Sequence, residues 1–357
     1  MKINNEKSVI VGMSGGVDSS VTALLLKEQG YRIRGVALKL WAYNSENPCC
    51  SLKDLHDAEI ISKQLGIEFE IIDMRDQFRD NVVDYYTREL VSGRTPNPCI
   101  FCNDRLKFGL LLDYALKNNF DYVATGHYAR VEYDGVKYKL LKGIDLNKDQ
   151  SYFLFMLDQN RLAKTLFPIG RLDKTGVRKL AQESELITCA KDDSQELCFL
   201  PSGGIDEFLS EYTNIEVHSG EIVNTKGLTM GKHRGLPFYT IGQRKGIGVY
   251  GLKPVYVVDI DGKGNKIVVD DEVKLMRDTF TVSAVNWIAG EEPLLPLHAD
   301  VRIRYRHKES RALIDKDRDR LIVKFEKPQR AITPGQAAVF YYDSEVLGGG
   351  WIWEVLN

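Results

Sequence analysis

Short apolar runs alternate with longer amphipathic stretches over roughly the first 120 residues of the chain. The runs that read as buried strands are residues 9–11, 33–40, 69–73 and 122–125. Two stretches between them, residues 19–29 and 54–65, have helical character and end at Gly30 and Gly66, where a helix favours a left-handed cap. This alternation predicts βαβ units and a parallel sheet.

The pattern changes after about Gly204, where short strands with period-two alternation are separated by glycine-rich turns. Residues 255–258 and 266–269 flank Asp261 and Gly262 and predict a hairpin. The last 80 or so residues show no strong helical period and predict a small all-β barrel or sandwich. The expected division is an α/β domain, a small linking domain and a β-barrel, at residues 1–205, 206–275 and 276–357.

Length and composition agree with this division. At about 150 residues per domain, 357 residues suggest two or three domains. With 27% charged and 43% hydrophobic residues, the chain has the balance of a water-soluble protein, and it contains no run long enough to span a bilayer. The first apolar run is too short for a secretory signal, so we expect a cytoplasmic protein. A net charge of −2 neither supports nor excludes a nucleic-acid partner.

The segment Ser-Gly-Gly-Val-Asp-Ser-Ser, residues 14–20, lies between the first predicted strand and the first predicted helix. Its glycines permit a tight turn, and the amide groups at the start of the helix face an anion. Asp18 is a candidate ligand for Mg²⁺ on a bound pyrophosphate. The segment is neither a Walker loop nor a dinucleotide fingerprint. It resembles the loop of the PP-loop ATPases, which cleave ATP to AMP and pyrophosphate.

Six cysteines in so long a chain are too few for a disulfide framework, and the spacing of Cys99 and Cys102 suggests metal or redox chemistry. Two prolines in residues 94–103 predict an extended loop around this pair. Cys198 follows another polar stretch and supplies a third candidate nucleophile. Structural roles are expected for the remaining cysteines, Cys49, Cys50 and Cys189.

A basic stretch covers residues 300–308. If this stretch is a strand, Arg302, Arg304 and Arg306 lie on one face of it. Three neighbouring guanidinium groups need an anionic partner. A phosphate backbone and nearby carboxylates are both compatible with the pattern.

Across essentially its whole length the sequence resembles the tRNA-specific 2-thiouridylase (MnmA) family. The segments that carry the resemblance are GMSGGVDSS at 12–20, GRTPNP at 93–98, CN at 102–103, ATGHY at 124–128, NKDQSYFL at 147–154, IGQRKG at 241–246 and TPGQ at 333–336. Several such segments in the same order are more specific than any one of them.

The resemblance implies that ATP adenylates the C2 oxygen of the wobble uridine in tRNAs for Lys, Glu and Gln, and that sulfur then replaces AMP. It implies that Cys198 carries a persulfide and that Cys102 resolves the intermediate through a Cys102–Cys198 disulfide. The implied ATP contacts are Gly12, Met13, Ser14, Gly15, Gly16, Val17, Asp18, Ser19, Leu38 and Gly126. The implied tRNA contacts are Asn97, Pro98, Cys99, His127, Lys148, Asp149, Gln150, Arg304, Tyr305 and Gln336.

Several alternatives stay open. Cys99 occupies a position where some members of the family have aspartate, and Cys99, Cys102 and Cys198 are also suitable ligands for a [4Fe-4S] cluster that binds hydrosulfide at an open iron. A structural zinc lacks a fourth ligand. His127 and residues 148–150 also suit purely structural roles. A different adenylating synthetase, another tRNA thiolase and a non-enzymatic tRNA-binding protein are the competing functions. The sulfur donor is either a relay protein or a cysteine desulfurase.

Overall fold

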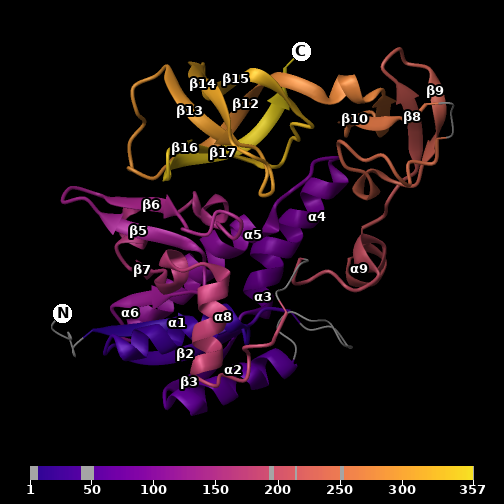
Figure 1. Ribbon diagram of the computed structural model, residues 1–357. Helices are drawn as coiled ribbons and strands as arrows, with labels where there is room; N and C mark the ends of the chain where they lie inside the picture. Colours follow the sequence, from indigo (N-terminus) through magenta and orange to yellow (C-terminus); the bar gives the residue numbers. More distant parts are fainter. Residues whose placement is uncertain (1–6, 42–51, 193–196, 214, 250–252, 357) are drawn as a thin grey trace.

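The computed structural model describes residues 7–41, 52–192, 197–213, 215–249 and 253–356 (Figure 1). An α/β domain occupies one end of the molecule, and two β-rich units occupy the other end. None of the described helices is long and apolar enough to cross a membrane. Cys49 and Cys50 lie outside the described residues.

A parallel sheet with the strand order β3-β2-β1-β4-β7 forms the centre of the α/β domain. The bounds are β1 Ser8–Gly12, β2 Arg32–Lys39, β3 Glu68–Asp73, β4 Tyr122–Ala124 and β7 Thr165–Leu166. The predicted strands and their parallel arrangement are therefore confirmed. Strands β2 and β3 lie on one side of β1, and β4 and β7 lie on the other side. The order in which strands are added to the sheet therefore reverses at β1. The carboxyl end of β1 is consequently the place where an α/β sheet of this kind opens a ligand crevice.

Helices on both sides of the sheet bury its apolar residues. Those of the α/β domain are α1 Val17–Glu28, α2 Leu52–Leu65, α3 Arg75–Phe78, η1 Arg79–Val83, α4 Asp84–Val91, α6 Leu111–Lys117, α7 Gln159–Leu162 and α8 Lys174–Glu183, with short turns at η3 Ser151–Leu154 and η4 Pro168–Arg171. The predicted glycine caps are confirmed, with φ values of 81° at Gly30 and 62° at Gly66.

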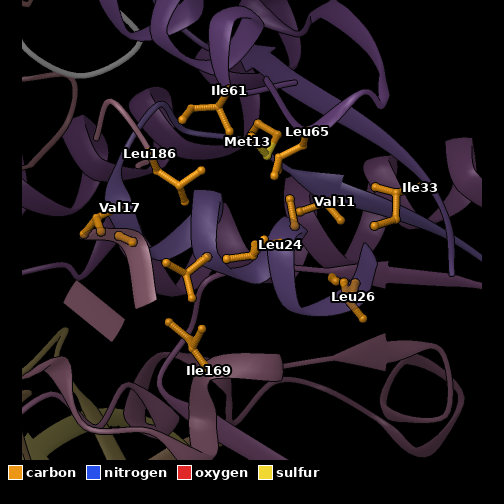
Figure 2. Packing of buried hydrophobic residues seen from close by; sticks show 14 of the residues in the cluster. Val11, Met13, Val17, Leu24, Leu26, Ile33, Ile61, Leu65, Ile169 and Leu186 are labelled. Atoms are coloured by element: carbon orange, nitrogen blue, oxygen red, sulfur yellow. The ribbon is translucent and has the colours of Figure 1, made fainter. Parts of the chain in front are cut away.

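The apolar core around α1 holds the start of that helix against the end of β1. Figure 2 shows part of this core; the labelled side chains are Val11, Met13, Val17, Leu24, Leu26, Ile33, Ile61, Leu65, Ile169 and Leu186. Met13 and Val17 belong to this core and bracket residues 14–16. The glycine-rich turn is thus anchored at both ends by buried side chains, and burial of this kind is the main source of stability in a domain.

The segment with Cys99 and Cys102 differs from its prediction as an extended loop. The backbone is extended only up to Asn97, which has φ −116° and ψ 94°. Helix α5 Pro98–Phe101 begins directly afterwards and continues into the π-helix η2 Cys102–Leu110 and then into α6. Pro98 does not prevent this because a proline in the first turn sacrifices no intrahelical hydrogen bond. Cys99 and Cys102, three residues apart at the start of a helix, lie on the same helical face.

The central unit contains α9 Gly204–Tyr212 and a sheet with the strand order β10-β11-β8-β9. Its strands are β8 Gly220–Asn224, β9 Thr229–His233, β10 Tyr256–Asp261 and β11 Lys266–Asp270, and its short turns are η5 Leu236–Phe238 and η6 Glu272–Leu275. Strands β10 and β11 are antiparallel, which confirms the predicted hairpin.

The C-terminal unit is a closed barrel in the order β12-β15-β14-β13-β16-β17, completed by pairing of β17 with β12. Its strands are β12 Met276–Trp287, β13 Leu297–Arg302, β14 Ser310–Asp317, β15 Arg320–Arg330, β16 Ala337–Tyr342 and β17 Glu345–Val355. The prediction of a continuous basic strand over 300–308 is wrong. Strand β13 ends at Arg302, and the following residues form turns that lead to β14.

A hairpin of the α/β domain joins the barrel sheet. Strands β5 Ala129–Tyr133 and β6 Tyr138–Lys142 pair with each other, and β6 also pairs with β17 through Leu140–Val346 and Leu141–Glu345. The apolar cluster beneath this junction contains side chains from both units, among them Leu154 and Val339. Backbone pairing and apolar packing therefore hold the barrel against the α/β domain (Figure 1).

A chain of buried charges lies at the same junction. The Asp149 side chain is fully buried, and its Oδ2 atom lies 3.1 Å from an Arg302 guanidinium nitrogen. Arg302 also pairs with Glu309 at 2.5 Å, and Glu309 pairs with Lys142 of β6. The Asp149 Oδ1 atom accepts a hydrogen bond from the Ser151 amide at 3.1 Å. Buried charges are tolerated only when each has its counter-charge, so this network depends on all its members.

We predict that Arg302→Met lowers the free energy of unfolding by about 3–5 kcal/mol, because it leaves the Asp149 carboxylate buried without its cation. Chemical denaturation measures the change. Arg306→Met is the matched control: Arg306 is exposed in the next turn, and its loss should change stability by no more than about 0.5 kcal/mol. Equal stability of the Arg302 variant and the wild type would contradict the proposed dependence.

Candidate functional site

A single cleft of about 2730 Å³ extends from the phosphate loop to the barrel. Its walls come from the carboxyl end of the parallel sheet, the start of α5, the loop at 146–150, the segment around Cys198 and the turns after β13. Candidate site residues from widely separated parts of the sequence therefore line the same cleft.

The loop at residues 13–16 is a rigid turn at the start of α1. The Ser19 hydroxyl donates to the Gly16 carbonyl at 3.0 Å, and the Ser14 amide donates to the Ser19 hydroxyl at 3.2 Å. Gly15 has φ +69°, and a side chain there would collide with the Asp54 carbonyl oxygen. Only glycine suits this position. The turn and the first turn of α1 together form the kind of amide-lined cradle that binds phosphate.

The other predicted nucleotide contacts surround this loop. Leu38 at the end of β2 and Gly126 after β4 both line the cleft, as do the phosphate-loop residues 12–14 and 16–19. A Cβ atom on Gly126 would lie 2.8 Å from the Asp18 carbonyl carbon, so glycine is needed for the close approach of these two segments. The structure thus brings the predicted nucleotide contacts other than Gly15 to the cleft, and Gly15 lies in the turn between them.

Asp18 has partners that the sequence did not reveal. Both of its carboxylate oxygens lie 2.9 Å from the Lys174 ammonium, and the Tyr128 hydroxyl donates to Oδ1 at 2.8 Å. Lys174 is the first residue of α8, 156 positions away along the chain. No local pattern around Lys174 marks it, so only the fold identifies it as part of the site.

Lys191 was missed for the same reason. Its ammonium lies 2.6 Å from Asp54 and 2.7 Å from Asp57, and it donates to the Gly15 carbonyl at 2.9 Å. Burial alone lowers the pKa of Lys191, but the hydrogen bonds to the two carboxylates raise it above the ordinary value overall. Lys191 therefore stays charged and ties the segment that leads toward Cys198 to the phosphate loop.

The three predicted reactive thiols lie on two segments. Cys99 and Cys198 line the cleft, while Cys102 is buried, with 8% of its surface exposed. Cys102 and Cys198 pack against the same apolar cluster, which includes Phe199. The described cysteines are thiols rather than disulfides. In the parts of the chain that the structure describes, no three potential metal ligands gather around one point. Cys189 packs beside the α1 core, as predicted.

His127 is buried behind the nucleotide end of the cleft. Its Nδ1 atom lies 2.6 Å from the Thr125 hydroxyl. Burial, and to a smaller extent the positive charge of Lys107, holds the pKa of His127 well below its usual range. The imidazole is therefore neutral near pH 7 and cannot form an ion pair with phosphate.

The remaining predicted tRNA contacts lie farther along the cleft. Asn97, Pro98, Lys148, Asp149, Gln150, Arg304, Tyr305 and Gln336 all line it. Several of them have intramolecular partners: Gln150 Oε1 accepts from the Tyr128 amide at 3.1 Å, and Gln336 donates to the Thr95 carbonyl at 2.9 Å. Asp149 belongs to the buried charge network, so its carboxylate serves the structure directly. Contact of these residues with tRNA stays a prediction.

Three known domain families match consecutive parts of the chain. They are described as the tRNA methyl transferase HUP domain over residues 7–202, the tRNA methyl transferase PRC-barrel domain over 206–271 and the aminomethyltransferase beta-barrel domain over 277–352. These matches agree with the observed α/β domain, central unit and closed barrel.

Full-length relatives decide the family. The tRNA-specific 2-thiouridylase MnmA of Nostoc punctiforme is 46% identical, and the match covers 96% of this chain and 98% of the relative. This chain belongs to the tRNA-specific 2-thiouridylase family. Its relatives in Solibacter usitatus and Carboxydothermus hydrogenoformans are each 44% identical, with 97% and 99% of this chain covered and 99% of each relative. A solved NMN synthetase from Francisella tularensis has a TM-score of only 0.36 and does not bear on function.

The pH dependence of stability provides a test of the cleft wall formed by the turns after β13. Burial, followed by the charge of Arg304, lowers the pKa of His307 to about 4. The unfolded chain therefore binds a proton at this residue between about pH 6.5 and pH 4 that the folded chain does not. Stability from the neutral histidine is present above pH 6.5 and is lost as the pH falls toward 4. We predict that His307→Asn reduces the loss of Tm between pH 7.5 and pH 5, as measured by calorimetry.

His298 is exposed on β13 and provides the control for this measurement. His298→Asn should keep the wild-type pH dependence of Tm. An unchanged pH dependence in the His307 variant would show that this histidine is not held neutral in the folded protein.

Proposed function

We propose that this chain is an ATP-dependent tRNA uridine 2-sulfurtransferase that acts on the wobble uridine of tRNAs for Lys, Glu and Gln. The observation that supports the proposal most directly is that one cleft contains both the phosphate loop and Cys198, with Cys102 packed in the same apolar cluster as Cys198. A nucleotide site and a thiol in one cleft suit a reaction that first activates oxygen and then replaces it with sulfur.

In the first step, the uridine O2 atom attacks the α-phosphorus of ATP. The bond from this phosphorus to the bridging oxygen breaks, pyrophosphate leaves and the uridine N3 proton is released. Residues 14–19 bind the departing pyrophosphate through backbone amides at the start of α1 and through the Ser14 hydroxyl, while the Ser19 hydroxyl holds the turn by donating to Gly16. The product carries AMP on O2, which makes C2 open to a sulfur nucleophile.

In the second step, a persulfide on Cys198 attacks C2, a carbon–sulfur bond forms and AMP leaves. The Cys102 thiolate then attacks the Cys198 sulfur, so the sulfur–sulfur bond breaks and the thiocarbonyl remains on the base, which takes up a proton at N3. The two cysteines are oxidised to a disulfide, and a thiol or dithiol reductant must reduce it before the next turnover. A relay protein or a cysteine desulfurase supplies the persulfide sulfur.

The candidate cofactors besides ATP are Mg²⁺ and a [4Fe-4S] cluster. Mg²⁺ fits best as an ion held mainly by ATP phosphates, because the Asp18 carboxylate already binds Lys174. A [4Fe-4S] cluster fits less well, because among the described residues Cys99, Cys102 and Cys198 are not gathered closely enough to ligate one metal centre. No step is assigned to a cluster. Iron and sulfide analysis after anaerobic purification tests this assignment, and active protein without iron is the expected result.

We predict that Cys198→Ala abolishes 2-thiouridine formation while ATP cleavage to AMP or tRNA adenylate survives. The nucleophile is lost, but residues 12–19 are untouched. Nucleoside mass spectrometry of tRNA after incubation with ATP, magnesium and a sulfur source measures thiolation, and pyrophosphate release without a sulfur source measures adenylation.

Cys189→Ala is the matched control for that experiment, because Cys189 packs beside the α1 core and does not line the cleft. It should thiolate tRNA at nearly the wild-type rate. Undiminished thiolation by Cys198→Ala would refute the proposed sulfur route.

A further inference from the structure

Lys107 is a cation in the cleft without an ionic partner in the part of the chain that the structure describes. It lies on η2, is partly buried and lines the cleft. No described carboxylate oxygen lies within 4.0 Å of its ammonium group. Lys142 and Lys191, which also line the cleft, both have carboxylate partners. A partly buried cation without a counter-charge in a cleft is a candidate partner for a bound anion.

The position of Lys107 along its helix indicates which anion the lysine can reach. Lys107 lies five residues after Cys102 and four residues before Leu111. Leu111 reaches the first glycine of the phosphate loop: a Cβ atom on Gly12 would lie 4.0 Å from its Cδ2 atom. The helical run that carries Lys107 therefore extends from the Cys102 thiol to the start of the phosphate loop.

The environment of His127 supports the same position. The positive charge of Lys107 helps to keep this buried histidine neutral, so the two side chains are electrostatic neighbours. His127 directly follows Gly126, whose backbone packs against Asp18 and Ser19 of the phosphate loop. Lys107 thus lines the cleft close enough to His127 to influence its charge, beside the segment that packs on the phosphate loop.

We propose that Lys107 binds a non-bridging oxygen of the ATP α-phosphate and stabilises the charge that develops there during adenylation. The assignment rests on the proposed function. In the proposed reaction the amide cradle of residues 14–19 binds the pyrophosphate portion, which leaves the α-phosphate to a separate cation. The same contact stabilises AMP when the bond from C2 to the adenylate oxygen breaks and AMP leaves with both electrons of that bond. Electrostatic groups aimed at developing charge act in this way in many enzymes.

The RNA backbone is the competing anion and is less suitable. The exposed cations Arg306 and Lys308 lie on the turns after β13, where a large polyanion can approach from solvent. Lys107 lies instead on the helix that packs against the start of the phosphate loop. It is therefore better placed for the nucleotide than for the surface of a tRNA.

Single-turnover release of pyrophosphate from ATP, with tRNA and magnesium but no sulfur source, tests the assignment. Lys107→Met should slow this step roughly 100-fold, the usual loss when one charge-stabilising group is removed. The affinity for tRNA should not change. Lys107→Arg should recover part of the rate because it restores the charge. Lys117→Met removes an exposed lysine from α6, a later part of the same helical run, and should behave as the wild type does.

The two diastereomers of ATP with sulfur on the α-phosphorus provide a second readout. If Lys107 contacts one non-bridging oxygen, the ratio of the pyrophosphate-release rates for the two diastereomers should differ between the wild type and Lys107→Met. A purely structural role for the lysine would leave this ratio unchanged. An unchanged ratio together with a wild-type rate in Lys107→Met would overturn the assignment.

Two other outcomes are distinct from these. Weakened tRNA binding with a salt slope reduced by about 1 would assign Lys107 to the RNA backbone and overturn the proposal. Failure of the wild type itself to form AMP or pyrophosphate in the presence of tRNA would refute the proposed function and this assignment together. Normal pyrophosphate release by both the wild type and Lys107→Met would refute only the proposed role of Lys107.

Discussion

The ion pair between Asp149 and Arg302 is the constraint on which the cleft depends. Asp149 belongs to the α/β domain and is fully buried, and Arg302 ends a barrel strand with 12% of its side chain exposed. Glu309 and Lys142 extend the pair to the hairpin whose second strand joins the barrel sheet. Because a buried charge without its partner is strongly unfavourable, this network, together with the pairing of β6 with β17 and the apolar packing beneath it, sets the position of one wall of the cleft relative to the other.

That positioning has a chemical consequence. The phosphate loop is placed by local structure, since β1, the glycine turn and α1 follow one another directly. Cys198 and the cation-rich turns after β13 arrive from segments nearly 200 and 300 residues farther along the chain. The folding of the α/β domain brings Cys198 to the phosphate loop, and the docking of the barrel adds the turns after β13 to the same cleft.

The errors of the sequence-based predictions have clear physical causes. Two prolines suggested an extended segment around Cys99, yet Pro98 occupies the first turn of a helix, where proline is favourable. Three arginines in alternation suggested a basic strand, but Arg302 turns toward Asp149 and Glu309 and the strand ends there. Lys107, Lys174 and Lys191 carried no local signal, because their importance comes from partners or neighbours that are distant in sequence.

The sequence by itself determined the parallel sheet, the glycine caps, the phosphate loop, the β-rich second half and the family, because each follows from local periodicity or from short motifs in a fixed order. The tertiary structure alone decided the rest. It showed that Asp149 is an internal counter-charge, that Cys102 and Cys198 share one apolar cluster, and that Lys107 faces the cleft without a carboxylate partner among the described residues. These properties depend on burial and on neighbours brought together by folding, and no local pattern records either.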